Sequence, residues 1–135
     1  MLKICGLIKG GGGTTMHFNV IFQQIEEYHK ALGHSRAFDT MEQRMQSMRN
    51  GSLALMMELA ELVDSTPWKP WREIADQPFD KDNATREIVD IIFFLVQICE
   101  QLQITPFEIE DKFNNVLKNN YARLDNGYSK KGGDN

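Results

Sequence analysis

The chain has little cysteine and no excess of cationic residues. Cys5 and Cys99 are the only cysteines among its 135 residues, and they show no CxxC spacing. A disulfide-stabilised fold is therefore not indicated, and we expect a reducing, cytoplasmic setting. The 15 Lys and Arg against 19 Asp and Glu give a formal charge of -4. The chain lacks the basic surface that nucleic-acid binding requires, so no nucleic-acid partner is expected.

Long apolar runs and strand patterns are also missing. The most apolar stretch, residues 88–99, is interrupted by Asp90 and Gln97 and is too short to span a bilayer. The N-terminus has no sustained hydrophobic region of the signal-peptide kind. No segment alternates apolar and polar residues as a strand does. We therefore expect no membrane association and an all-α fold. Cys99 lies within an apolar helical pattern, where a free thiol behaves as a small apolar side chain.

Glycine clusters at one place and marks the start of the domain. Gly10 to Gly13 precede Thr14 and Thr15, and such a segment buries too little apolar surface to become ordered. The sequence thus predicts a flexible leader over 1–15, a domain over 16–130 and a flexible tail over 131–135. With about 115 residues, one domain has room for a hydrophobic core.

Helical periodicity fills the domain. It predicts an amphipathic helix over 17–32 that ends at Gly33, and a weaker helix or partly ordered connector over 35–48. The triplet 50–52, Asn-Gly-Ser, predicts a break before a helix over 53–64. A further helix, capped by Asp82 or Asn83, should run to about Leu102.

The last helix has the clearest start signal in the chain. Thr105, Pro106 and Glu108 supply a cap residue, a proline in the first turn and the glutamate of a capping box. This helix should reach Tyr121 or Leu124. Four to five helices joined by short connections predict an all-α bundle.

Two pairs of acids lie inside the two most apolar helices. Glu58 and Glu61 form one pair and Glu87 and Asp90 the other, each at i, i+3 spacing, so each pair lies on one helix face. A solvated acidic stripe is the ordinary explanation of such residues. Here the surroundings are too apolar for a wide stripe, and no lysine or arginine follows any of the four at i+4.

Antiparallel packing of these two helices would join the four carboxylates into one oxygen-rich cluster. Such a cluster suits Mg²⁺, or Mn²⁺, which prefer carboxylate and water ligands. His17, His29 and His34 show no HExxH spacing, so zinc is disfavoured and we interpret them as surface histidines. Magnesium held by few protein ligands leaves positions for substrate phosphates. The available cations are Lys69, Arg72, Lys118, Arg123, Lys130 and Lys131.

The acid pairs and their context resemble a known group of enzymes. Residues 58–61 and 87–90 are similar to the ExxE and ExxD motifs of the all-α nucleoside triphosphate pyrophosphohydrolases, which include MazG-like enzymes and the dimeric dUTPases. Residues 68–72, Trp-Lys-Pro-Trp-Arg, resemble the WKWWK-like motif of dimeric dUTPases. Residues 120–128 resemble that family's NxxR followed by GY. The resemblance covers about residues 17–130 and implies a bundle of the MazG and dimeric dUTPase type.

The resemblance implies a reaction and a set of site residues. The reaction is Mg²⁺-dependent hydrolysis of a nucleoside triphosphate, dUTP above all, to the monophosphate and pyrophosphate. Glu58, Glu61, Glu87 and Asp90 would bind the metal, and Glu58 and Glu61 would be catalytic. The implied phosphate-binding residues are Lys69, Arg72, Arg123, Tyr128 and Lys130. The implied nucleoside-binding residues are Gln23, Gln24, Trp71 and Asn120.

Some positions depart from the family pattern and leave alternatives open. Phe93 stands where dimeric dUTPases tend to have histidine, Pro70 replaces an aromatic residue, and Leu124 follows Arg123. These differences affect the expected base, so a house-cleaning pyrophosphatase for dCTP, dATP or a modified nucleotide is the first alternative. A non-catalytic helical interaction module is the second. The extensive apolar faces of the acid-bearing helices predict a homodimer or homotetramer.

Overall fold

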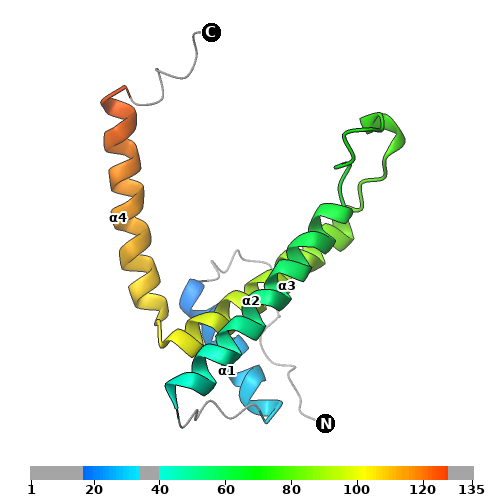
Figure 1. Cartoon of the computed structure of the whole chain (residues 1–135). Helices are drawn as coiled ribbons and strands as arrows, with labels where there is room; N and C mark the ends of the chain where they lie inside the picture. Colours follow the sequence, from blue (N-terminus) through cyan, green and yellow to red (C-terminus); the bar gives the residue numbers. More distant parts are fainter. Residues whose placement is uncertain (1–16, 34–39, 128–135) are drawn as a thin grey trace, which may run out of the picture.

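The computed structural model describes residues 17–33 and 40–127, and these form four α-helices. They are α1 (Phe18–Ala31), α2 (Met41–Asp64), α3 (Lys81–Leu102) and α4 (Pro106–Asp125), with a short 3-10 helix η1 (Ile74–Asp76) between α2 and α3 (Figure 1). The described ranges contain no strand, which confirms the all-α prediction. The predicted leader over 1–15, the tail over 131–135, His34 and residues 35–39 of the connector lie outside the described residues.

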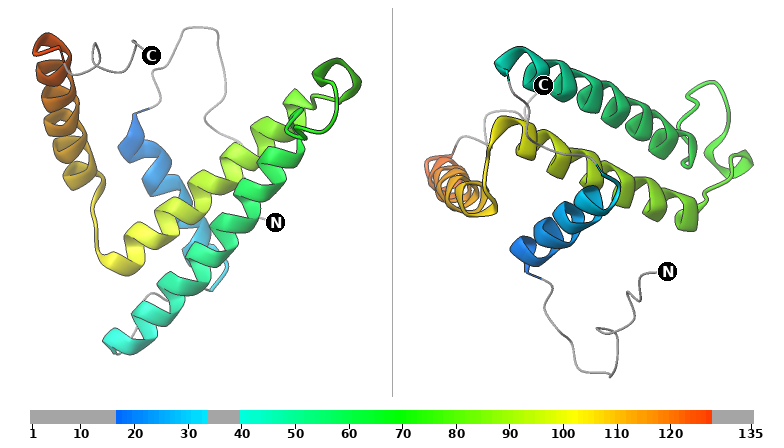
Figure 2. Two further views of the ribbon diagram at one scale, coloured as in Figure 1. Left: turned by 45° about the horizontal axis from the view of Figure 1, so that its top comes forward. Right: turned by 90° about the horizontal axis from the view of Figure 1, so that it is seen from below.

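The helices α2 and α3 form an antiparallel pair that lies side by side along most of its length (Figures 1 and 2). At one end the guanidinium of Arg44 donates to the carbonyl of Gln101, with N···O distances of 2.7 and 3.0 Å. At the other end the Asn83 side-chain amide donates to Ser65 Oγ at 2.7 Å. The contacts run in opposite order along the two helices, so the acid-bearing helices pack antiparallel, which is the condition under which the acids were expected to meet.

The predicted break at residues 50–52 is wrong, because α2 continues from Met41 through Gly51 to Asp64. A Cβ placed on buried Gly51 would lie 3.6 Å from Ile98 Cγ1, so the glycine marks a close approach of α2 to α3. Ser52 Oγ donates to the Met48 carbonyl at 2.8 Å and thus stays on the helix. Packing against α3 outweighs the cost of about 1 kcal/mol of a helical glycine.

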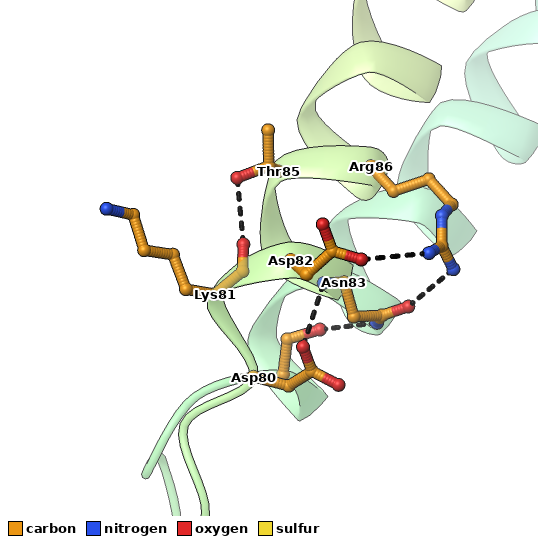
Figure 3. Close-up of polar contacts among 7 residues, drawn as sticks. Asp80, Lys81, Asp82, Asn83, Thr85 and Arg86 are labelled. Atoms are coloured by element: carbon orange, nitrogen blue, oxygen red, sulfur yellow. Dashed lines mark hydrogen bonds and ion pairs between the residues drawn. The ribbon is translucent and has the colours of Figure 1, made fainter.

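The start of α3 also differs from the prediction (Figure 3). Asp80 is the N-cap, and its Oδ1 accepts a hydrogen bond from the Asn83 backbone N–H at 2.9 Å. Asp82 instead pairs with Arg86 one turn later at 3.2 Å, and the Asn83 amide bridges to Ser65 on α2. The tie to α2 fixes where α3 begins, and this long-range contact cannot be read from the local sequence. The end of α3 at Leu102 is as predicted.

The small core lies where α1 crosses α3, on the side of α3 away from α2 (Figure 2, right). Phe22, Ile25 and Val96 are buried there, with Cys99 packed beside them. Burial, and then the charge of Glu100, raise the pKa of the Cys99 thiol, which agrees with its interpretation as a small apolar side chain.

His29 is not the surface histidine that the sequence suggested. Its Nδ1 lies 3.1 Å from Glu100 Oε2, and the two side chains are only 12% and 3% exposed. Its ring also contacts Phe93 of α3, with centroids 6.5 Å apart. Amphipathic periodicity does not identify this histidine as buried, because only the crossing of α1 over α3 brings Glu100 to it.

The helix α4 begins as predicted and then departs from the rest of the chain (Figure 1). The Thr105 side chain accepts from the Glu108 backbone N–H at 3.2 Å, and the Glu108 carboxylate accepts from the Thr105 N–H at 2.7 Å. These bonds lower the pKa of Glu108. Within the described residues no Cα atom of α4 lies within 8 Å of α2, and α4 approaches α1 instead. Apart from Ile109 and Pro106, its side chains are exposed.

Among the described helices, none is by itself both long and apolar enough to cross a bilayer.

Candidate metal and nucleotide site

Three of the four predicted acids meet across the seam between α2 and α3. Glu58 and Glu61 come from the last two turns of α2, and Glu87 comes from the second turn of α3. One carboxylate oxygen of each lies within 4.8 Å of the others. Glu87 is buried, with 6% of its surface exposed, whereas Glu61 is exposed. The i, i+3 spacing on α2 and the antiparallel packing together produce this cluster.

Asp90 lies one turn beyond Glu87 and outside the group of three, but its charge acts on the same site. The pKa of Glu58 is raised, first by desolvation, then by its hydrogen bond with Glu87 and by the charges of Glu61, Asp90 and Glu87. In the described ranges neither lysine nor arginine forms an ion pair with any of these acids. Within the part of the chain that the structure describes, several carboxylates therefore lie together without a cationic side chain to balance them.

The donor set fits a divalent cation that prefers oxygen. Repulsion among close carboxylates is unfavourable unless a positive charge faces them. All of the donors are carboxylate oxygens, a composition that suits Mg²⁺ or Mn²⁺ and not the nitrogen and sulfur ligands typical of structural zinc. Glu58, Glu61 and Glu87 are the residues that would hold such an ion, with Asp90 close by.

The loop between α2 and α3 projects from the same end of the helix pair as the acids (Figure 1). Trp68 Nε1 donates to Asp64 Oδ1 at 2.8 Å, and the Trp68 and Trp71 rings meet edge to face with centroids 5.6 Å apart. Trp71 is 70% exposed. This loop, residues 65–80 and named the tryptophan loop from here on, is thus anchored to the last turn of α2, while the Trp71 indole faces solvent.

Gln77 holds this loop closed, a role that the sequence did not reveal. Its Oε1 accepts from the Lys69 N–H at 2.9 Å, and its Nε2 donates to the carbonyls of Lys69 at 3.0 Å and Arg72 at 3.1 Å. Because of these hydrogen bonds, Lys69 and Arg72, which were predicted to bind phosphate, lie on one short segment whose backbone is held by Gln77. The only local signal was a glutamine in a polar stretch, which is too common to predict a clamp.

Other predicted site residues lie on elements that a single chain does not bring to the acids. Gln23 and Gln24 are exposed on α1, and Gln23 donates to Glu27 at 3.1 Å. Asn120 and Arg123 are exposed on α4, whose backbone does not approach α2. Tyr128 and Lys130 lie outside the described residues.

A shallow apolar groove of about 410 Å³ separates α1 from α4. Phe18, Ile109 and Phe113 line it, with Glu110 and Asn114 at its edge. None of these residues was predicted as part of a site, because Phe18, Ile109 and Phe113 read as ordinary core positions of amphipathic helices and Glu110 and Asn114 as ordinary surface positions. The groove contains none of the four acids.

Comparison with known proteins identifies the family of this chain. No curated protein and no solved structure matches the chain. The family model for dUTPase, that of the dimeric dUTPases, matches residues 17–124, a span that includes α1, α2, α3 and nearly all of α4. The match also contains all four acids and the tryptophan loop. The chain therefore belongs to the dimeric dUTPase family.

Proposed function

We propose that this protein hydrolyses a nucleoside triphosphate, dUTP above all, to the monophosphate and pyrophosphate, with Mg²⁺ at the acid cluster. The observation that carries the proposal is the meeting of Glu58, Glu61 and Glu87 within 4.8 Å in a chain of the dUTPase family. Family membership supports the substrate class, and the all-oxygen donor set supports the choice of ion. Mn²⁺ would satisfy the same ligands.

The four acids have separate tasks in this proposal. Glu58, Glu61 and Glu87, with Asp90 close by, would hold the cation, which when bound would neutralise phosphate oxygens and lower the pKa of nearby water. Glu58 contacts Glu87 and lies next to Glu61, so it is best placed to orient the attacking water and accept its proton. The water oxygen bonds to a phosphorus, and the bond to pyrophosphate breaks with its electron pair on the leaving group.

The tryptophan loop supplies two cations, Lys69 and Arg72, at the end of the helix pair near the acids. Lys69 and Arg72 extend from the end of the helix pair at which the acids lie, and Gln77 fixes the backbone that carries them. Donors of this type bind phosphate oxygens through charge-assisted hydrogen bonds. The exposed face of Trp71 is available to stack on a base. Arg123, Asn120, Tyr128, Lys130, Gln23 and Gln24 complete the proposed nucleotide-binding set.

A nucleotide panel tests the proposal. The purified protein is incubated with dUTP, dCTP, dATP, dTTP and UTP, with and without Mg²⁺, and pyrophosphate release is measured. We expect Mg²⁺-dependent turnover that is fastest with dUTP. Equal turnover of all bases would contradict the assignment to dUTP, and faster turnover of dCTP or dATP would favour a house-cleaning enzyme.

Variants of the acids separate an enzyme from an interaction module. Glu58→Gln should lower turnover by about 10²–10⁴-fold if the side chain accepts a proton, and Glu61→Gln and Asp90→Asn should abolish it. Asp82→Asn is the matched control, because Asp82 is an exposed carboxylate on α3 that pairs with Arg86. Activity that survives in the Glu61 and Asp90 variants would exclude the proposed metal site.

A further inference from the structure

A polar contact joins the end of α2 to the start of α3 and reaches the backbone of one of the acids. The Asn83 side-chain amide donates to Ser65 Oγ at 2.7 Å, and the Ser65 hydroxyl donates to the Glu61 carbonyl at 3.0 Å. Since a carbonyl only accepts, the hydroxyl proton points to Glu61, and the amide must be the donor to the hydroxyl. The three groups form one directed chain of hydrogen bonds from α3 to Glu61.

The register of the helix pair places this contact one turn from the acids on both helices. Ser65 follows Glu61 by four residues on α2, and Asn83 precedes Glu87 by four residues on α3. Because the helices run antiparallel, these equal steps lead to the same level of the seam, about 6 Å from the acids. A shift of Asn83 against Ser65 would therefore also shift Glu87 against Glu61.

A second contact holds the same register on the other side of the acids. Gly51 precedes Glu61 by ten residues, and Gln97 follows Glu87 by ten residues. A Cβ on Gly51 would lie 3.8 Å from Gln97 Cδ, so the helices are close there. That contact is about 15 Å along the helices from the acids. The bond between Ser65 and Asn83 is much nearer to them.

Repulsion among the acids acts against this register. Glu58 and Glu61 of α2 and Glu87 of α3 have carboxylate oxygens within 4.8 Å of one another. Like charges at such distances push the ends of the two helices apart. Ser65 is only 6% exposed, so its hydrogen bonds are shielded from water and resist this separation.

Further hydrogen bonds fix the Asn83 side chain in the orientation that Ser65 needs (Figure 3). The Asn83 backbone N–H donates to Asp80 Oδ1 at 2.9 Å, and its side-chain Oδ1 accepts from Arg86 at 3.4 Å. The amide nitrogen is therefore the end that faces Ser65. The Asp80 N–H also donates to the Ser65 carbonyl at 3.0 Å. The contact between the helix ends is thus in place without any ion.

We propose that Ser65 and Asn83 are positioning residues of the metal site, whose hydrogen bond sets the separation of Glu61 from Glu87 and thereby the affinity for Mg²⁺. Magnesium demands nearly ideal octahedral geometry, so a small displacement of one carboxylate weakens its binding. Residues that hold metal ligands in place change metal affinity or activity by about 10–100-fold when they are removed. This inference rests on the proposed function, since it takes the acid cluster to bind a divalent cation.

Binding of Mn²⁺ without nucleotide tests the inference. Free Mn²⁺ is measured by electron paramagnetic resonance for the wild-type protein, Ser65→Ala, Asn83→Ala and the double variant. We expect each single variant to bind Mn²⁺ about 10–100-fold more weakly than wild type. The double variant should bind no more weakly than the weaker single variant, because all three lose the same hydrogen bond.

Thr85→Ala is the matched control. The Thr85 hydroxyl donates to the Lys81 carbonyl one turn back at 2.8 Å, as the Ser65 hydroxyl does to Glu61, but this bond lies within α3. Its removal should leave the affinity for Mn²⁺ unchanged. A loss in Thr85→Ala as large as in Asn83→Ala would overturn the inference, since any weakening of the first turn of α3 would then have the same effect.

Circular dichroism in EDTA separates a loss of fold from a loss of positioning. Binding is compared at a temperature at which the variants are folded. Ser65→Ala keeps the backbone carbonyl that accepts from Asp80, so it decides the question if Asn83→Ala does not fold. A folded Ser65→Ala protein with a lower melting temperature and the wild-type affinity for Mn²⁺ would overturn the inference. A double variant whose loss is the product of the two single losses would overturn it as well.

Pyrophosphate release from dUTP by the same proteins distinguishes this inference from the proposed function. The single variants should need more Mg²⁺ than wild type and approach the wild-type kcat when Mg²⁺ is saturating. Hydrolysis with an unchanged Mg²⁺ requirement in the variants would overturn the inference and leave the proposed function. The expected losses of Mn²⁺ affinity without any hydrolysis would support the inference and overturn the proposed function. A wild-type protein that binds no Mn²⁺ would overturn both.

Discussion

Glu58 on α2 and Glu87 on α3 share a hydrogen bond across the helix seam, and the pKa of Glu58 is raised by desolvation and by this contact. One of the two carboxylates is buried. Such an arrangement is unfavourable by itself and becomes favourable when a cation is bound. The acid cluster should therefore destabilise the metal-free protein and stabilise the metal-bound one.

The variant Glu58→Gln tests whether the acid cluster destabilises the metal-free protein and stabilises the metal-bound protein. It removes a charge from the cluster, so it should raise the melting temperature in EDTA by a few degrees, which corresponds to about 1 kcal/mol. The same variant should lose most of the stabilisation that Mg²⁺ gives the wild-type protein, because stabilisation by a ligand follows its affinity for the native state. Thermal denaturation with and without Mg²⁺ measures both effects. A Glu58→Gln protein less stable than wild type in EDTA would argue against repulsion in the cluster.

The capping box of α4 should make its start sensitive to acid. The hydrogen bonds of Glu108 to the Thr105 backbone and hydroxyl lower the pKa of its carboxyl below the unfolded value of 4.5. The ionised form is thus favoured by folding, so this stabilisation is present above pH 4.5 and is lost as the pH falls through the lowered folded pKa. Melting temperatures across that acid range, compared with Glu108→Gln, should show a shallower decline for the variant. Parallel curves would mean that the capping box contributes no pH dependence.

Gly51 offers a stabilising substitution in the middle of α2. The added Cβ of Gly51→Ala would lie 3.6 Å from Ile98 Cγ1, an ordinary contact distance. Replacing a helical glycine by alanine should therefore raise the free energy of unfolding by about 0.5–1 kcal/mol. Gly51→Leu is the contrasting variant, and it should destabilise by about 1–3 kcal/mol because its side chain would separate α2 from α3. Urea denaturation measures both. A Gly51→Ala protein that is less stable than wild type would show that α2 and α3 approach each other at this position too closely to accept a methyl group.

Gln77 should control the order of the tryptophan loop. Gln77→Ala removes the hydrogen bonds to Lys69 and Arg72, and each is worth about 0.5–1.5 kcal/mol when buried and less when exposed. Indole quenching by acrylamide should therefore increase, and nucleotide binding should weaken, with little change in helix content. Gln77→Glu is the matched variant, since it keeps the acceptor for the Lys69 N–H and loses the Nε2 donors. Unchanged quenching in both variants would show that the loop is ordered without Gln77.

Local sequence signals predicted those parts of the fold that depend on interactions between residues close in the sequence. Thr105, Pro106 and Glu108 identified the start of α4 because a capping box is made within four residues. The i, i+3 spacing of the acids identified a shared face, and antiparallel packing then brought Glu87 to Glu58 and Glu61. The acid cluster was thus predictable once the pairing of two helices was assumed.

Long-range contacts determined the features that the sequence did not predict. Gly51 lies inside a helix at a point where Ile98 of α3 approaches it, and Asp80 caps a helix whose first turn is bonded to Ser65 of the preceding segment through Asn83. His29 is partly buried where Glu100, 71 positions later, lies beside it. Gln77 closes its loop through backbone groups that have no sequence signature. In each case the role of the residue depends on a contact with another part of the chain, which its local sequence does not show.

The tie at the base of the tryptophan loop has a consequence for how the family can diversify. The Ser65 carbonyl accepts from the Asp80 N–H at 3.0 Å, and the Ser65 hydroxyl accepts from the Asn83 side-chain amide. These hydrogen bonds join the first residues of the loop to the last. Closure of the segment between them is therefore independent of its internal length, since longer loops cost little more entropy. Insertions between Thr66 and Phe79 should therefore leave the two acid-bearing helices in register, because the hydrogen bonds of Ser65 lie outside the inserted segment.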